Sequence, residues 1–425
     1  MARQIKNKPE VLAPGGTLEK LKTAILYGAD ACYIGGEAYG LRSRAGNFDY
    51  PEMKEAVEFA HEHNAKIYVA ANMVTHEGDE KGAGEFFRTI RDIGVDAVLI
   101  SDPALMDICV TEAPGLPIHL STQASATNYE TLNFWKEEGL ERVVLAREVS
   151  IEEIKEMREK VDVEIEAFIH GAMCISYSGR CVLSNHMTNR DANRGGCAQS
   201  CRWKYGLFEQ ELPGLTTAVG KGEEGIEEAF SMSAVDLAMI EHIPDIVEAG
   251  VNSLKIEGRM KSIHYVATVA NVYRAAVDSY CADPDNYEFK QEWLDELWKV
   301  AQRELATGFF YKTPSEDEQL FGPRRKIPQY AFVGQVLDYD PATQIATIQQ
   351  RNNFGVGDTV EFFGPGMRHF QQKIELLKDE DGNDIDRAPH AMMICQTKVE
   401  QPVQRFDMIR KQKKDRSRNR QKNEA

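Results

Sequence analysis

The feature that most constrains the fold is an alternation of short apolar runs with amphipathic segments over the first two thirds of the chain. The apolar runs are rich in Val and Ile and mostly lack polar alternation, as in strands that are covered on both faces. Eight of them predict strands, at Val11–Ala13, Ala31–Gly35, Ile67–Ala71, Ala97–Ser101, Ile118–Ser121, Val143–Ala146, Val163–His170 and Ser253–Glu257.

The segments between these runs predict helices, at Thr17–Tyr27, Pro51–His63, Glu80–Ile93, Pro103–Ala113, Tyr129–Glu138, Ser150–Lys160 and Ser262–Cys281. Thr17 and Ser150 stand at N-cap positions, and Glu153 completes a capping box with Ser150. Three glycines each follow a helix, where a left-handed residue is favoured, at Gly28, Gly94 and Gly139.

Eight strand–helix units are the number that closes a TIM-type (β/α)8 barrel. A doubly wound open sheet is the alternative, but the first loop, APGGT, lacks the spacing of a GxGxxG dinucleotide fingerprint. We therefore predict an α/β protein with a barrel over residues 1–312. Residues 171–250 form an insertion after strand seven, and it emerges at the C-terminal face, where the active sites of such barrels lie.

Beyond the barrel, Glu288–Thr307 predicts a helix, and residues 313–329 have the composition of a linker. Residues 330–408 show short alternating strands separated by turns, which predict a small antiparallel β-barrel domain that docks a partner or substrate. Residues 409–425 predict a basic disordered tail.

The net charge of −17 argues against a surface that binds nucleic acid everywhere, yet residues 410–425 carry eight Lys/Arg against two acidic residues. This tail is either a solvated segment or an arm that binds RNA phosphates. No apolar run approaches the roughly 20 residues that span a bilayer, and the N-terminus lacks a secretory leader. We expect a cytoplasmic protein whose cysteines are thiols or metal ligands.

Four of the eight cysteines fall within 28 residues, with the spacing C-x6-C-x15-C-x3-C: Cys174, Cys181, Cys197 and Cys201. Thiolates are ligands for zinc or for iron–sulfur clusters. Structural zinc sites usually show paired C-x2-C knuckles, which are missing here, so the spacing favours an iron–sulfur cluster and leaves zinc open. The other four cysteines lie in apolar patterns and are interpreted as buried small hydrophobes.

The cysteine block carries a family resemblance. EAFIHGAMCISYSGRCVLSN, NRGGCAQSCRW and SLKIEGRMKS look like the signature of the collagenase-like peptidase family, and the similarity extends through VLAPGGTLEKLKTAILYGADACYIGG and IHLSTQASATN. The branch that it resembles most is that of the proteins for prephenate-dependent 5-hydroxyuridine formation in tRNA. The small C-terminal domain resembles that of the family as well.

The resemblance implies a tRNA-modifying enzyme that hydroxylates the wobble uridine in the anticodon stem-loop. It implies a [4Fe–4S] cluster on Cys174, Cys181, Cys197 and Cys201, prephenate as the hydroxyl donor, and a shorter paralogue as a possible partner. One relative takes its fourth ligand near the stretch that reads SMSAVDL here, which has no cysteine, so Cys201 is favoured as the fourth ligand.

Polar side chains at the ends of the predicted strands converge on the barrel mouth. Because prephenate is a dicarboxylate, arginines are its natural partners, and we expect Arg42, Arg147 and Arg259 to bind it. His119 and Gln123 are further candidates for substrate binding. The catalytic candidates are His170, Lys255 and Glu257. The alternative is structural, since the strand-eight charges could form a buried ion network and either histidine could simply fill the barrel.

Two rival functions remain. A metallopeptidase is suggested by the family name, but the chain has neither GxSxG nor HExxH. The other rival is a zinc-stabilised scaffold without catalytic activity.

Overall fold

The computed structural model describes residues 8–41, 46–208, 218–221, 229–315, 319–321 and 330–413. The chain divides into two compact units. The first consists of Met1–Leu294 with Arg303–Arg325, and the second of Asp295–Gln302 with Lys326–Ala425. The boundary therefore falls inside a helix, α10 (Gln291–Val300), rather than in the predicted linker alone.

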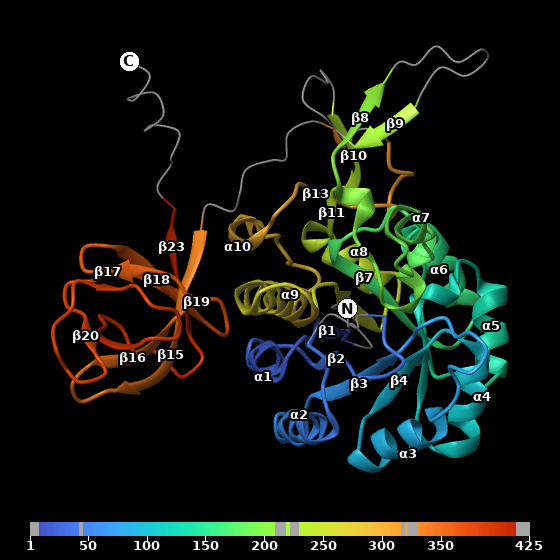
Figure 1. The fold of residues 1–425 in the computed structure, drawn as a ribbon, viewed down its shortest axis with the longest axis horizontal. Helices are drawn as coiled ribbons and strands as arrows, with labels where there is room; N and C mark the ends of the chain where they lie inside the picture. The colour runs from blue at the N-terminus through green and yellow to red at the C-terminus, as the bar shows by residue number, and fades with distance from the viewer. Residues whose placement is uncertain are drawn as a thin grey trace. The chain divides into compact units, whose positions relative to one another are not determined.

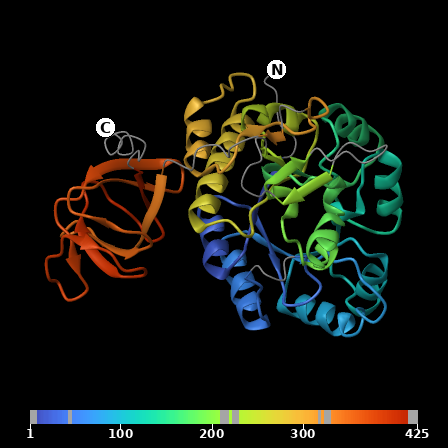
Figure 2. The ribbon, with the colours of Figure 1, turned by 45° about the horizontal axis from the view of Figure 1, so that its top comes forward.

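Eight parallel strands close into a barrel in the first unit, which confirms the predicted fold class (Figures 1 and 2). The strand β12 pairs in parallel with both β7 and β1, and this double pairing closes the ring. The barrel strands are β1 (Glu10–Pro14), β2 (Ala31–Gly35), β3 (Lys66–Ala71), β4 (Ala97–Ile100), β5 (Ile118–Leu120), β6 (Arg142–Val144), β7 (Glu164–Ala172) and β12 (Ser253–Ile256). Nearly all their residues are buried, since helices cover the outside.

Helices surround the strands as Figure 2 shows: α1 (Leu18–Leu26), α2 (Tyr50–Glu62), α3 (Ala83–Ile93), α4 (Pro103–Glu112), α5 (Tyr129–Glu137), α6 (Ile151–Lys160), α8 (Ile243–Glu248) and α9 (Ile263–Ala282). Thr17 caps α1, and the capping box of Ser150 with Glu153 starts α6. The three helix-terminating glycines have φ between 86° and 103°, so these local predictions are confirmed.

The insertion between β7 and β12 builds the mouth of the barrel. Its first part is irregular, with short turns at η2 (Tyr177–Gly179), α7 (Leu183–Thr188), η3 (Ala192–Arg194) and η4 (Ser200–Arg202). The strands β8 (Tyr205–Phe208), β9 (Ala218–Lys221) and β10 (Ala229–Ala234) project from one end of the barrel, where β10 also pairs with β14 (Gln319–Phe321) (Figure 1). β14 lies in the segment that was predicted as a linker.

One predicted helix is partly wrong. Glu288–Thr307 contains α10 only to Val300, and the chain then forms β13 (Leu305–Ala306) beside β11 (Asp236–Ala238). Arg303 forms an ion pair with Asp236, so a tertiary pairing overrides the local helical pattern. β11 in turn lies antiparallel to β7 and lengthens the barrel wall.

The described strands of the second unit form an antiparallel sheet of seven strands, in the order β19-β18-β23-β15-β16-β22-β20, and a separate antiparallel pair, β17 with β21. Its elements are β15 (Tyr330–Asp340), β16 (Ile345–Gln350), β17 (Phe354–Gly355), β18 (Thr359–Gly364), β19 (Arg368–Lys373), β20 (Lys378–Asp379), β21 (Arg387–Ala388), β22 (Ile394–Lys398) and β23 (Met408–Gln412). An apolar core with Val333, Ile348 and Phe362 holds it together. The antiparallel domain is confirmed, although no pairing between the described strands closes a ring.

The predicted tail begins too early. β23 runs to Gln412, and Arg410 is fully buried in the second unit, where its guanidinium meets Glu361 at 2.9 Å and Glu296 of α10 at 2.7 Å. A carboxylate on each side stabilises this cation away from water. The rest of the predicted tail, residues 414–425, lies outside the described residues.

In the part of the chain that the structure describes, no helix combines the length and apolar character needed to span a membrane.

Candidate functional site

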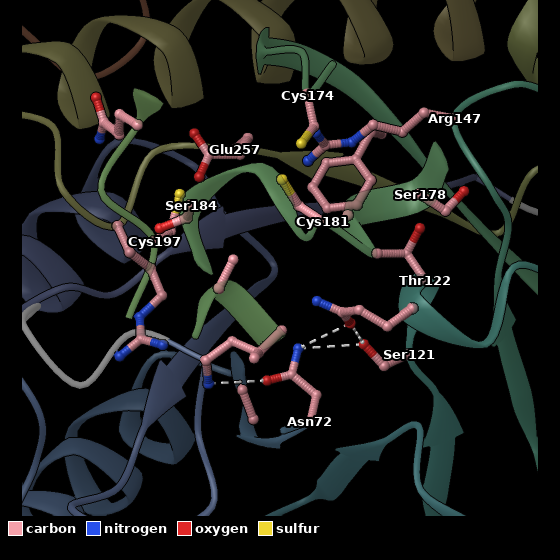
Figure 3. Close-up of a pocket in the computed structure, with 18 of the residues that line it drawn as sticks. Asn72, Ser121, Thr122, Arg147, Cys174, Ser178, Cys181, Ser184, Cys197 and Glu257 are labelled. Atoms are coloured by element: carbon pink, nitrogen blue, oxygen red, sulfur yellow. Dashed lines mark hydrogen bonds between the residues drawn. The ribbon is translucent and has the colours of Figure 1, made fainter. Parts of the chain in front are cut away.

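A cavity of about 170 Å³ lies at the C-terminal ends of the barrel strands (Figure 3). Its wall combines three groups of residues: side chains at strand ends, the irregular part of the insertion, and the loop that follows β12. Tyr33, Leu99 and Phe168 supply apolar surface from the strands. This is the face at which barrels of this type build their active sites.

The four clustered cysteines all line this cavity, and each is partly buried. Cys174 follows β7 directly, whereas Cys181, Cys197 and Cys201 come from the turns of the insertion. Figure 3 shows the sulfur atoms of Cys174, Cys181 and Cys197 on the same side of the cavity. The sequence-predicted ligands are therefore brought together around one space.

Polar contacts hold the cysteine segment to the barrel loops. Glu148, after β6, accepts hydrogen bonds from the backbone N–H and the hydroxyl of Ser178, whose φ of 45° is left-handed. Asn193 exchanges two hydrogen bonds with the backbone of Cys181, at 3.1 and 3.0 Å. Arg180 donates to the carbonyl of Gln123 at 2.6 Å. The segment is thus fixed at several points rather than free to swing.

The four thiols are the candidate donor set for the metal group that the sequence implies. No group of three or more His, Cys, Asp or Glu side chains in the described ranges is arranged to hold a single metal ion. A tetrahedral zinc site would need sulfur atoms about 3.8 Å apart, given Zn–S bonds of about 2.3 Å. A [4Fe–4S] cluster places iron and sulfide atoms between its ligands, so its four thiolates stand farther apart.

Two further features suit a cluster. Burial raises the pKa of the Cys201 thiol. Arg202 opposes this, and the thiols of Cys174, Cys197 and Cys181 raise it further, so those three thiols lie within electrostatic range of Cys201. Ser200 lies between Cys197 and Cys201 in the sequence, and its hydroxyl is buried without a hydrogen-bond partner among the described groups. A hydroxyl in that place can donate to a thiolate or a sulfide. Four thiols and an unpartnered hydroxyl at one cavity are donors of the kind that suit an iron–sulfur cluster.

Two of the three predicted arginines line the cavity. The guanidinium of Arg147 stacks 3.9 Å above the ring of Phe168 and donates to the carbonyl of Ala172 at 3.0 Å. Arg259 donates to Asn47 at 2.9 Å, and its guanidinium lies so close to Gly35 that a Cβ there would overlap it. The glycine is therefore required for this close approach. Arg42 lies outside the described residues.

A hydrogen-bonded polar group faces the cysteines across the cavity (Figure 3). Asn72, which follows β3, donates to Ser121 and to Gln123, both at 3.2 Å. Ser121 donates to Gln123 at 2.6 Å. Gln123 was predicted as a substrate-binding residue. Asn72 was not, although it stands at a strand end and the same rule applied to β3 would have found it.

The two charged residues predicted as catalytic on strand eight, Lys255 and Glu257, lie in different environments. Lys255 lines the cavity but pairs with Glu166 at 2.6 Å inside the barrel, and Arg142 meets the same carboxylate at 3.3 Å. Glu166 is completely buried. Burial alone would raise its pKa, yet Lys255 and Arg142 outweigh burial and lower it. Lys255 therefore belongs to a buried ion network, whereas Glu257, beyond the end of β12, is the acidic residue among the described lining groups.

The two predicted histidines do not line the cavity. His170 is enclosed by Tyr265 and Tyr273, and its Nδ1 lies 3.3 Å from the Tyr273 hydroxyl. His119 packs against Tyr68 beside Arg142 in the barrel interior. Burial lowers the pKa of each to about 3, so both are neutral at physiological pH. His119 and His170 were candidates for the site because they lie on barrel strands. Both side chains are instead packed in the filled barrel interior and do not reach the cavity.

Two family models match the chain. Residues 16–320 match the model described as peptidase family U32, and residues 328–410 match the peptidase family U32 C-terminal domain. The chain belongs to peptidase family U32. The resemblance seen in the cysteine block is thereby confirmed, and the two U32 regions correspond to the barrel and to the antiparallel domain.

Three similar U32 relatives have names that concern RNA. The tRNA hydroxylation protein P1 of Bacillus subtilis (strain 168) is 54% identical, with 97% of this chain and 96% of the relative covered. The tRNA hydroxylation protein P of Escherichia coli (strain K12) is 34% identical, with 90% and 92% covered. The 23S rRNA 5-hydroxycytidine C2501 synthase of Escherichia coli (strain K12) is 35% identical, with 64% and 39% covered.

Proposed function

We propose that this chain hydroxylates carbon 5 of the wobble uridine in tRNA, with a [4Fe–4S] cluster on Cys174, Cys181, Cys197 and Cys201 and prephenate as the hydroxyl donor. The observation that carries the proposal is that four thiols, two arginines and a carboxylate line one cavity at the barrel mouth. The names of relatives that match nearly the whole chain support RNA hydroxylation as the chemistry.

The residues of the cavity take distinct roles in the proposal. Arg147 and Arg259 bind the two carboxylates of the donor through charge-assisted hydrogen bonds. Glu257 accepts the proton from carbon 5. A bound cluster supplies redox-active iron beside these groups. Forming the C5–O bond with loss of that proton oxidises uracil by two electrons, and the donor takes them up as its C–O bond breaks and its carbon gains a hydrogen.

The insertion that supplies the cysteines suits an RNA loop. Residues 171–208 hold five Lys/Arg and one acidic residue, in a chain that is strongly acidic as a whole. Arg180 and Lys204 are exposed in this segment, as is Arg194, which pairs with Asp79 at 2.6 Å, and Tyr177 is 57% exposed. Cations attract phosphates, and an exposed ring can stack on an unpaired base. A uridine in a single-stranded anticodon loop can be turned out to reach such a mouth at little cost.

Peptide hydrolysis has less support. A nucleophile needs a base within hydrogen-bond reach, and no histidine occurs among the described residues that line the cavity. The exposed part of the site is instead cationic and carries thiols. A second, shorter family member as a partner stays a prediction, as does a role for the C-terminal tail.

The test combines a genetic and a chemical measurement. A strain that lacks the gene is complemented with the wild type, Cys181→Ala or Cys281→Ala, and its tRNA nucleosides are analysed by mass spectrometry. Cys281 is a matched control, since it is also partly buried but lies on α9 outside the cavity. We expect 5-hydroxyuridine derivatives with the wild type and the control, and none with Cys181→Ala.

Anaerobically purified protein is analysed in parallel for iron. About four iron atoms per chain are expected for the wild type and for Cys281→Ala, with most of the iron lost in Cys181→Ala. Normal 5-hydroxyuridine in the Cys181→Ala strain, or one zinc and no iron per chain, would contradict the proposal.

A further inference from the structure

The group formed by Asn72, Ser121 and Gln123 has a fixed direction of hydrogen bonding. The backbone N–H of Leu41 donates to Oδ1 of Asn72 at 3.3 Å, and a backbone N–H can only donate. The Asn72 carboxamide must therefore turn its Nδ2 toward Ser121 and Gln123. The Gln123 atom that meets Nδ2 has to be the acceptor, Oε1, which also accepts from the Ser121 hydroxyl at 2.6 Å.

Because Oε1 of Gln123 accepts two hydrogen bonds, the other atom of its carboxamide is the amino group Nε2, which is a donor. Its Nε2 has no hydrogen-bond partner among the described residues, and Gln123 lines the cavity. Gly179 stands beside it, and a Cβ at that glycine would come within 3.8 Å of Nε2. The cavity therefore presents this N–H2 group in a fixed orientation, beside the turn that contains Gly179.

A fixed donor distinguishes the two pyrimidines. Uracil carries an acceptor at position 4, its O4, whereas cytosine carries an amino donor there. An N–H2 group that faces position 4 makes a hydrogen bond to uracil and sets two donors against each other with cytosine. Carbon 5 is the ring atom next to position 4, so a base held in this way keeps its reacting carbon at the same side of the cavity.

We infer that the Gln123 carboxamide reads O4 of the target base and selects uracil over cytosine, with Asn72 and Ser121 as the residues that fix its orientation. The inference rests on the proposed function. With cytosine the buried donor is left without an acceptor, at a cost of about 1–3 kcal/mol, which corresponds to roughly 5- to 150-fold in affinity.

The test uses the full chain and two RNAs, anticodon stem-loops that differ only in U or C at the wobble position. Binding is measured by fluorescence anisotropy as the ratio of Kd for the C form to Kd for the U form. The wild type is expected to give a ratio of roughly five or more. Gln123→Glu keeps an acceptor for Asn72 and Ser121 but turns an oxygen toward the base, so we expect the ratio to fall below one.

Two further variants control for other causes. Asn72→Ala frees the Gln123 carboxamide to rotate, so the ratio should approach one without loss of the fold. Gln371→Glu makes the same chemical change at an exposed position of the second unit and should leave the ratio at the wild-type value. A wild-type ratio of one, or an unchanged ratio in Gln123→Glu, overturns the inference while RNA binding stands. Failure of the wild type to bind either RNA overturns the proposed function as well.

Discussion

The buried pair of Glu166 and Lys255 is expected to stabilise the barrel, and removal of one charge tests this directly. In Glu166→Gln the ammonium of Lys255 loses the carboxylate that lies 2.6 Å away, at a position that is 4% exposed. Arg142 stays paired, because Glu10 and Glu164 each lie 2.7 Å from it. The cost is therefore that of one uncompensated buried charge, about 3–5 kcal/mol.

For a unit of this size about 2 °C of Tm is lost per kcal/mol, so Tm of the barrel should fall by roughly 6–10 °C. Thermal unfolding followed by circular dichroism measures it. Glu164→Gln is the matched control, since its side chain is half exposed and its pairing with Arg142 contributes at most about 1 kcal/mol. The double variant Glu166→Gln with Lys255→Met removes both charges and should recover at least half of the loss.

The same pair sets a pH dependence. Since the pKa of Glu166 is lowered in the folded state, its stabilisation is present above the ordinary glutamate range and disappears as pH falls through the folded pKa. The gap between wild type and Glu166→Gln should therefore be widest near pH 7 and shrink on acidification. A Lys255→Met variant with unchanged Tm but no hydroxylation would refute the ion network and restore Lys255 as a catalytic residue.

Three further outcomes follow from the site. Glu148→Ala releases the left-handed turn of the cysteine segment, and iron content of anaerobically purified protein should fall several-fold; full iron occupancy would show that the turn is held by other contacts. Gly35→Ala displaces the Arg259 guanidinium, so calorimetry should show prephenate binding weakened roughly tenfold through loss of a charge-assisted hydrogen bond; unchanged affinity would remove Arg259 from the donor site. Arg180→Ala should lower the slope of log K against log salt for the U-form stem-loop by about 0.7, and an equal slope would place the phosphates elsewhere.

The barrel was accessible from the sequence because strands buried on both faces leave continuous apolar runs, and all eight runs are strands. The errors lie where a distant partner decides the structure. Leu305 and Ala306 read locally as helix but pair with β11, and Arg410 reads as part of a charged tail but is enclosed by Glu296 and Glu361. Neither partner can be identified from the pattern around the residue itself.

The site was predicted in part for a similar reason. The cysteine spacing located four thiols of one cavity, and strand ends located Gln123, Arg147 and Arg259. A strand position does not tell whether a side chain reaches open space, which is why His170 was assigned a role that its enclosure by two tyrosines does not support. The orientation of the Gln123 carboxamide follows from hydrogen bonds that involve Leu41 and Asn72, and these contacts are visible only in the structure.

Closure of the ring by β12 has a consequence for the order of folding. Its partner strand β1 begins at Glu10, and the hydroxyl of Ser253 reaches that residue across 243 positions of sequence. During synthesis the segment that carries the four cysteines leaves the ribosome well before Ser253. β1 therefore cannot pair with β12 until later, and until then the thiols are accessible to solvent. Pairings of such long range are slow to form. If the four thiols bind a cluster as proposed, the period before the ring closes is when they are most accessible to iron.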